Sequence, residues 1–335
     1  MAALRSVLGD LEPGSVHGSV AACMHLAPDW RPITDRDQDA GLPSEARLAK
    51  ARTAGNHLAD VVSSIGASGI GLIIDATPPG AGRDPMRLHD VAASTGVAIV
   101  AATGAHAPPA RLGRVHDRSA EHLAEWFALE ICNGMAAIAG DSFRGVPILS
   151  ERAIGVAGDA LNDAAVRAGV IRITLASASI DRADFALVDA AGMTAGANGV
   201  ATILDAPPGT DLGTVASRYE AAGGNRNRMV LAPGGRTPDG LLAAAGVGLA
   251  VVIGSPSTPA EGPLAIWLAT IRALLRHGLL TNVVLTVGGA KGPDDGRAQG
   301  WEANPSPFDA ICGIDAAELL KVTTTNALRI FSRHH

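Results

Sequence analysis

The sequence contains few cysteines, few lysines and no long apolar run. Its three cysteines, Cys23, Cys132 and Cys312, lie far apart without CxxC spacing. This excludes a disulfide framework and predicts a reduced, cytoplasmic chain. No apolar stretch approaches the roughly 18–20 residues of a membrane span, and the first residues lack the apolar run typical of a signal peptide. The only lysines are Lys50, Lys291 and Lys321, so nearly every basic residue is an arginine.

Excess positive charge is also lacking. The chain has 27 Lys and Arg residues against 33 Asp and Glu residues, a formal net charge of −6. This balance argues against nucleic acid or an anionic membrane as a partner. A hydrophobic content of 47% over 335 residues excludes intrinsic disorder and provides for a large core. The length allows one large domain or two ordinary ones.

Short apolar segments without polar alternation recur along the chain, as expected of strands buried on both faces. They lie at 19–26, 71–77, 96–104, 170–176, 199–206, 228–234, 248–254 and 283–289. Amphipathic helices are predicted between them, at 44–65, 85–94, 120–135, 181–191, 212–222, 237–245 and 261–277. Eight strands alternating with helices predict a single α/β domain with a parallel sheet.

An eightfold barrel fits this count, with 314–331 as a helical cap. A doubly wound sheet is the alternative. Its glycine fingerprint at 66–71 precedes a strand instead of following one, which disfavours it.

Several segments resemble the phosphotriesterase family of the amidohydrolase superfamily. The most specific is LIIDATPPGAGRDP at 72–85. Further matches lie at 6–13, 23–26, 94–104, 167–173, 228–239 and 313–331. The resemblance spans nearly the whole chain in the right order. It implies one (β/α)8 TIM barrel over 1–335, with an N-terminal hairpin at about 6–18 and closing helices at about 314–333.

The resemblance also implies two divalent metals at the C-terminal mouth of the barrel. The family ligands are a His-x-His pair, a carboxylated lysine, two further histidines and an aspartate. The resemblance puts the matching positions at Cys23 and His25, at Arg172, at or near Asp205, at or near Pro233, and at Gly288. Of these, only His25 keeps the family's residue type.

A shifted alignment does not restore the ligands. No histidine lies between His122 and His277, and no lysine lies between Lys50 and Lys291. An arginine neither carboxylates nor ligates a cation, and a stable zinc site needs three or four ligands. We therefore expect that the binuclear centre is lost and that no cofactor is bound.

Arg172 and Asp205 fall on neighbouring strands and could form an ion pair across the vacated mouth, because a buried guanidinium needs a partner. The predicted catalytic residues are His25 as general acid or base, Arg172 and Asp205. The candidate substrate-binding residues are Cys23, His106, Asp75 and Trp30. The ion pair could equally be structural, and Cys23 a small buried hydrophobe.

Three functions remain open at this point. The chain is a metal-independent small-molecule enzyme catalysing hydrolysis, elimination or isomerisation, a pseudoenzyme that binds a ligand, or a metal-dependent ester, lactone or phosphotriester hydrolase with a rearranged site. The expected ligand is a small molecule with a carboxylate or carbonyl group, with no nucleic-acid or membrane partner. The resemblance also implies a homodimer.

Overall fold

The computed structural model describes most of the barrel framework. The described residues are 2–24, 26, 58–60, 62–63, 66–67, 69–77, 85–104, 119–132, 134–135, 166–232, 237–254, 261–286 and 315–333. The predicted helix at 44–65 lies largely outside them.

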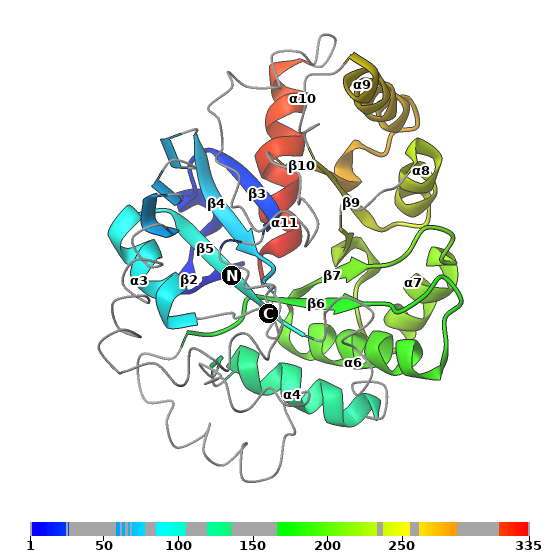
Figure 1. Cartoon of the computed structure of the whole chain (residues 1–335), viewed down its shortest axis with the longest axis horizontal. Helices are drawn as coiled ribbons and strands as arrows, with labels where there is room; N and C mark the ends of the chain where they lie inside the picture. Colours follow the sequence, from blue (N-terminus) through cyan, green and yellow to red (C-terminus); the bar gives the residue numbers. More distant parts are fainter. Residues whose placement is uncertain are drawn as a thin grey trace, which may run out of the picture.

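Eight parallel strands form a nearly closed barrel (Figure 1). In chain order they are β3 (Ser19–Met24), β4 (Ile70–Asp75), β5 (Ala98–Thr103), β6 (Val170–Thr174), β7 (Ala201–Asp205), β8 (Met229–Leu231), β9 (Ala250–Gly254) and β10 (Val283–Thr286). Each strand pairs with the next one along the chain. All eight predicted strands are confirmed.

A side chain links the first strand to the last. Thr286 on β10 accepts a hydrogen bond from the Ala22 amide on β3 at 2.9 Å and donates one to the Ala22 carbonyl at 3.2 Å. A threonine hydroxyl can both accept and donate, so Thr286 satisfies backbone groups that β3 would otherwise pair in a ladder.

Strand residues alternate between two apolar cores, as the two-residue period of a strand requires. On β6 and β7, Val170 and Ile203 belong to the core inside the barrel. Their neighbours Ile171 and Leu204 belong to the core between barrel and helices. This alternation fixes which residues near the strand ends face the mouth.

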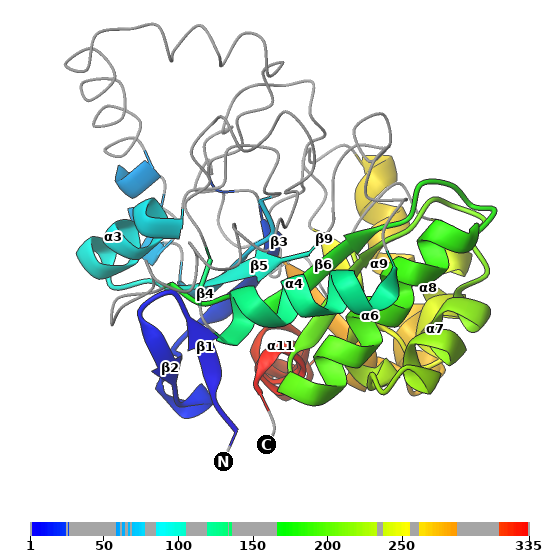
Figure 2. The same ribbon diagram turned by 90° about the horizontal axis from the view of Figure 1, so that it is seen from below.

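Helices surround the strands (Figures 1 and 2). They are α3 (Pro85–Thr95), α4 (Ala120–Cys132), α6 (Arg182–Asn198), α7 (Leu212–Ala221), α8 (Pro238–Gly246) and α9 (Glu261–Arg276). Aspartates begin two of them: Asp181 forms a capping box with Asp184 at α6, and Asp211 caps α7. No helix within the described ranges is long and apolar enough to cross a membrane.

Helix α6 continues beyond its predicted end at residue 191. It contains Gly192 and Gly196, where a Cβ atom would lie 2.5 Å from the Tyr219 carbonyl oxygen and 2.3 Å from the Gly223 carbonyl oxygen. The two glycines therefore permit close packing of α6 against α7 and the residues that follow α7. The helix ends at Gly199, which adopts the left-handed conformation.

The N-terminal end of the barrel is closed by both ends of the chain. The hairpin of β1 (Leu4–Ser6) and β2 (Gly9–Leu11), followed by η1 (Pro13–Ser15), lies at this end with the C-terminal helix (Figure 2). That helix comprises α10 (Ala316–Leu320), the π-helical turn η9 (Lys321–Thr325) and α11 (Asn326–Phe331). Leu4, Ile330 and Phe331 complete the inner core, which confirms the predicted hairpin and helical cap.

Arg228 was predicted to begin a strand but lies in the 3₁₀ turn η6 (Arg226–Arg228), ahead of β8. The Asn225 side chain accepts a hydrogen bond from the Asn227 amide and thereby starts this turn. The buried guanidinium of Arg228 then donates to the carbonyls of Gly199, Ile330 and Ser332. A second short turn, η7 (Leu280–Asn282), precedes β10.

Candidate functional site

The C-terminal ends of β6 and β7 bring Arg172 and Asp205 together. Each lies two residues beyond an inner-core residue, Val170 or Ile203, so both point into the mouth. Thr174 is the next inward-facing residue after Arg172 on β6, and the strand register pairs Thr174 with Asp205.

Arg172 and Asp205 form the predicted ion pair. Arg172 Nε donates to Asp205 Oδ2 at 2.5 Å, and Thr174 Oγ1 donates to the same oxygen at 3.4 Å. Burial alone would lower the pKa of the Arg172 guanidinium. The charge and hydrogen bond of Asp205 outweigh it, and the pKa lies above its ordinary value. Arg172 is therefore a permanent cation, held by a carboxylate from the adjacent strand.

A second contact ties Arg172 to the end of β4. Its Nη1 donates to the Ala76 carbonyl at 2.7 Å, and the residue is only 9% exposed. Strand β5 separates β4 from β6, and Gly104, just after β5, lies against the backbone of Arg172. A Cβ atom on Gly104 would lie 1.9 Å from the Arg172 carbonyl oxygen, and Gly104 has φ +124°.

Cys23 lies near this pair at the end of β3, where the pairing with β4 shifts register between Ala21 and Met24. Its φ of 60° is the one positive value among the described non-glycine residues. Burial raises the pKa of the Cys23 thiol to about 12; the Arg172 charge opposes this rise and the Asp205 charge adds to it. Cys23 is thus a neutral buried thiol at neutral pH, and not a thiolate nucleophile.

Asp75 ends β4 and is 1% exposed. Its Oδ1 accepts hydrogen bonds from the Leu26 amide at 3.0 Å and from Thr77 Oγ1 at 2.7 Å. These contacts hold the chain that follows β3 against the chain that follows β4. Its negative charge also acts on the nearby guanidinium of Arg172.

Three predicted site residues, His25, His106 and Trp30, lie outside the described residues, as do the positions Pro233 and Gly288. The sequence reasoning missed Thr174, the Ala76 carbonyl and Gly104. Thr174 could have been found from strand alternation, because it is the next inward-facing residue after Arg172. A backbone carbonyl and a close backbone contact leave no comparable signal in a sequence.

The described residues of the mouth do not fit the metals that the resemblance implies. A guanidinium has no lone pair for a cation, its positive charge repels one, and here it already engages Asp205 Oδ2. The nearby Cys23 is a protonated thiol, whereas a metal requires the thiolate. Among the described residues, no group of three His, Cys, Asp or Glu side chains is arranged to hold a metal ion.

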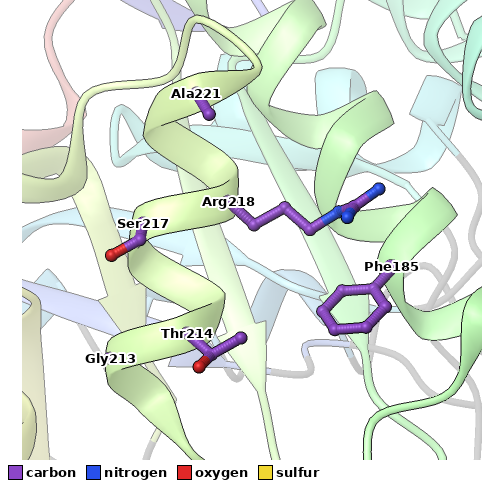
Figure 3. Close-up of a pocket in the computed structure, with 6 residues that line it drawn as sticks. All are labelled: Phe185, Gly213, Thr214, Ser217, Arg218 and Ala221. Carbon is purple, nitrogen blue, oxygen red and sulfur yellow. The ribbon is translucent and has the colours of Figure 1, made fainter.

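A shallow hollow of about 500 Å³ lies apart from this site, between α6 and α7 (Figure 3). Arg218 extends from α7 over the Phe185 ring, 4.5 Å from its centroid, and pairs with Asp189 through Nε at 2.7 Å and Nη2 at 2.5 Å. The hollow is lined by Phe185, Gly213, Thr214, Ser217, Arg218 and Ala221. It contains no residue of the barrel mouth, and its guanidinium is already neutralised.

Comparison with known proteins gives a family and a fold. The model of the phosphotriesterase family matches residues 4–188, more than half of the chain. No curated protein matches.

Solved structures match almost the whole length. One comes from the molecular engineering of organophosphate hydrolysis activity from a weak promiscuous lactonase template, with TM-score 0.71 and 19% identity over 98% of this chain and 99% of that chain. A triple mutant in organophosphorus hydrolase from Deinococcus radiodurans matches with TM-score 0.70 and 18% identity, over 98% and 97%. A mutant phosphotriesterase-like lactonase from the same organism matches with TM-score 0.69 and 18% identity, over 98% and 99%. At this identity the likeness establishes the barrel fold alone.

Proposed function

Because the chain belongs to the phosphotriesterase family, we propose that its barrel mouth still acts on a small molecule, with an arginine–aspartate pair in place of the family's metals. The proposed activity is metal-independent hydrolysis, elimination or isomerisation of a compound with a carbonyl or carboxylate group. Arg172, Asp205 and His25 are its proposed catalytic residues, and Cys23, Asp75, His106 and Trp30 its proposed substrate-binding residues.

The observation that carries this proposal is the ion pair itself. The resemblance puts Arg172 at the position of the family's bridging lysine, and the hydrogen bond of Arg172 to Asp205 supports the proposal because it brings the two side chains together. A fixed cation in a water-poor site can stabilise the negative charge that develops on a carbonyl oxygen, as a metal ion does elsewhere.

The carboxylate would supply the proton chemistry. The side chain of Asp205 is 25% exposed, whereas that of Arg172 is 11% exposed, so Asp205 is the more accessible member of the pair. Held through one oxygen by Arg172 and Thr174, it has the fixed orientation that a general acid or base needs. His25 would be its partner from the chain that follows β3.

The test is turnover without metal. Chelator-treated protein is incubated with a panel of lactones, carboxylic esters and phosphotriesters, and product formation is followed by mass spectrometry. We expect turnover of at least one compound that added zinc, manganese or cobalt does not increase, and loss of about 10²–10⁴-fold in Asp205→Asn. Turnover that appears only when metal is added would support the rearranged metallohydrolase instead.

A catalytically inactive ligand-binding protein is the second candidate. The observation favouring it is the low exposure of Arg172, which together with its hydrogen bonds to Asp205 and to the Ala76 carbonyl is typical of a structural ion pair. This candidate predicts saturable binding of a panel compound with no product, metal added or not.

A further inference from the structure

The two carboxylate oxygens of Asp205 differ in their surroundings. Arg172 Nε and Thr174 Oγ1 both donate to Oδ2. No described residue donates to Oδ1. An ionised carboxylate has acceptor positions on both oxygens, so Oδ1 keeps its capacity to accept.

The Asp205 carboxylate is exposed enough for a ligand to reach it. A quarter of the Asp205 side chain is exposed, while Arg172 is largely covered and donates to Oδ2 and to the Ala76 carbonyl. A ligand entering the mouth therefore meets the carboxylate before it meets the guanidinium.

The charges of the described mouth residues favour a positive ligand. Arg172 contributes one positive charge, and Asp205 and Asp75 contribute one negative charge each, so that these three groups sum to −1. Cys23 adds none, since its thiol stays protonated near neutral pH. A carboxylate ligand would have to compete with Asp205 for Arg172 and would lie beside like charge.

We propose that Asp205 determines ligand specificity, with Oδ1 accepting a hydrogen bond from a cationic nitrogen such as an amidinium or ammonium group. Arg172 and Thr174 both bind Oδ2 and thereby fix the orientation of the carboxylate, which leaves Oδ1 for the ligand. This inference rests on the proposed small-molecule site and narrows its ligand to an organic cation, at the expense of the carboxylate expected from the sequence.

Three probes of nearly equal shape test the proposal: benzamidine, benzamide and benzoate, which are positive, neutral and negative near neutral pH. Their dissociation constants for the full chain are measured by isothermal titration calorimetry at low salt. We expect benzamidine to bind at least about tenfold more tightly than benzoate, as a charge-assisted hydrogen bond warrants, with benzamide between them.

Two variants locate the effect. Asp205→Asn keeps the shape of the side chain but removes its negative charge, so the preference for benzamidine over benzoate should be lost. Asp189→Asn removes the carboxylate of the Arg218 pair in the outer layer and is the matched control; it should leave the preference for benzamidine unchanged. The comparison of probes on the unaltered chain stands even if Asp205→Asn does not fold.

Benzoate binding more tightly than benzamidine to the unaltered chain would overturn the inference and leave the mouth as a ligand site. A benzamidine preference that persists in folded Asp205→Asn would overturn it as well, because another group would then select the cation. Binding of none of the three probes, up to their solubility, would overturn both the inference and the small-molecule site on which it rests.

Discussion

At the scale of single residues, Arg172 gives the mouth a chemistry different from that of the lysine which the resemblance implies at this position. A lysine amine can be carboxylated and can ligate a metal, whereas a guanidinium remains a cation and requires an anionic partner. The sequence was sufficient to predict this partner, because Asp205 lies at the end of the adjacent strand, β7. It could not predict that one hydrogen bond would cross to the Ala76 carbonyl, since that contact depends on how the strand ends converge.

Breaking one side of the pair should cost more stability than replacing both sides. Asp205→Ala removes the carboxylate that binds the buried Arg172 guanidinium, and breaking such a pair costs about 3–5 kcal/mol in the free energy of unfolding. The double variant Arg172→Met with Asp205→Leu buries apolar groups of similar volume and should lie closer to the unaltered chain. Urea titrations of the three proteins measure the difference. A double variant less stable than Asp205→Ala would contradict the interpretation of Arg172 and Asp205 as a buried ion pair.

The thiol of Cys23 should resist alkylation. Burial raises its pKa from 9.0 to about 12, so that the protonated form stabilises the folded state below about pH 9 and this contribution is lost as the pH rises towards 12. Iodoacetamide applied to the folded chain at mildly alkaline pH should modify the exposed Cys132 and leave Cys23 unmodified, as read from peptide masses. Denatured protein is the control. Equal modification of both cysteines in the folded chain would refute the burial of Cys23.

At the scale of elements, apolar patterning was a reliable guide to strands and a poorer one to their ends. The eight strands could be predicted because residues buried on both faces of a sheet are apolar without alternation, and the strand residues are indeed buried. The length of the segment predicted at 96–104 was overestimated, because apolar and glycine residues continue beyond β5, which covers only Ala98–Thr103. The end of α6 was missed because Gly192 breaks the pattern of a helix while serving the packing between α6 and the chain of α7.

Gly104 is the backbone position on which the placement of Arg172 depends. In Gly104→Ala the new methyl group would have to displace the Arg172 carbonyl, and alanine would be strained at φ +124°. We expect a loss of at least about 2 kcal/mol of unfolding free energy. The matched control is Gly246→Ala in α8, where a Cβ atom meets nothing within 4 Å; it should be neutral or stabilise by about 0.5–1 kcal/mol. Thermal melts of both variants test this, and equal melting temperatures would contradict it.

At the scale of the whole molecule, the barrel is established by its strand order, while its assembly remains a prediction. The resemblance implies a homodimer of a chain that forms one domain over 1–335. Analytical ultracentrifugation at micromolar concentration should find a species of twice the 33.8 kDa chain mass. A single species at the chain mass would contradict the dimer.

The central claim is that an arginine–aspartate pair has replaced the metals of the family. It rests on residue types throughout the sequence and on the contact between Arg172 and Asp205. The direct measurement is elemental analysis of the purified chain by inductively coupled plasma mass spectrometry, after growth with zinc, manganese and cobalt and dialysis into metal-free buffer. We predict well under one equivalent of any transition metal per chain, whereas one or more tightly held ions per chain would contradict the claim.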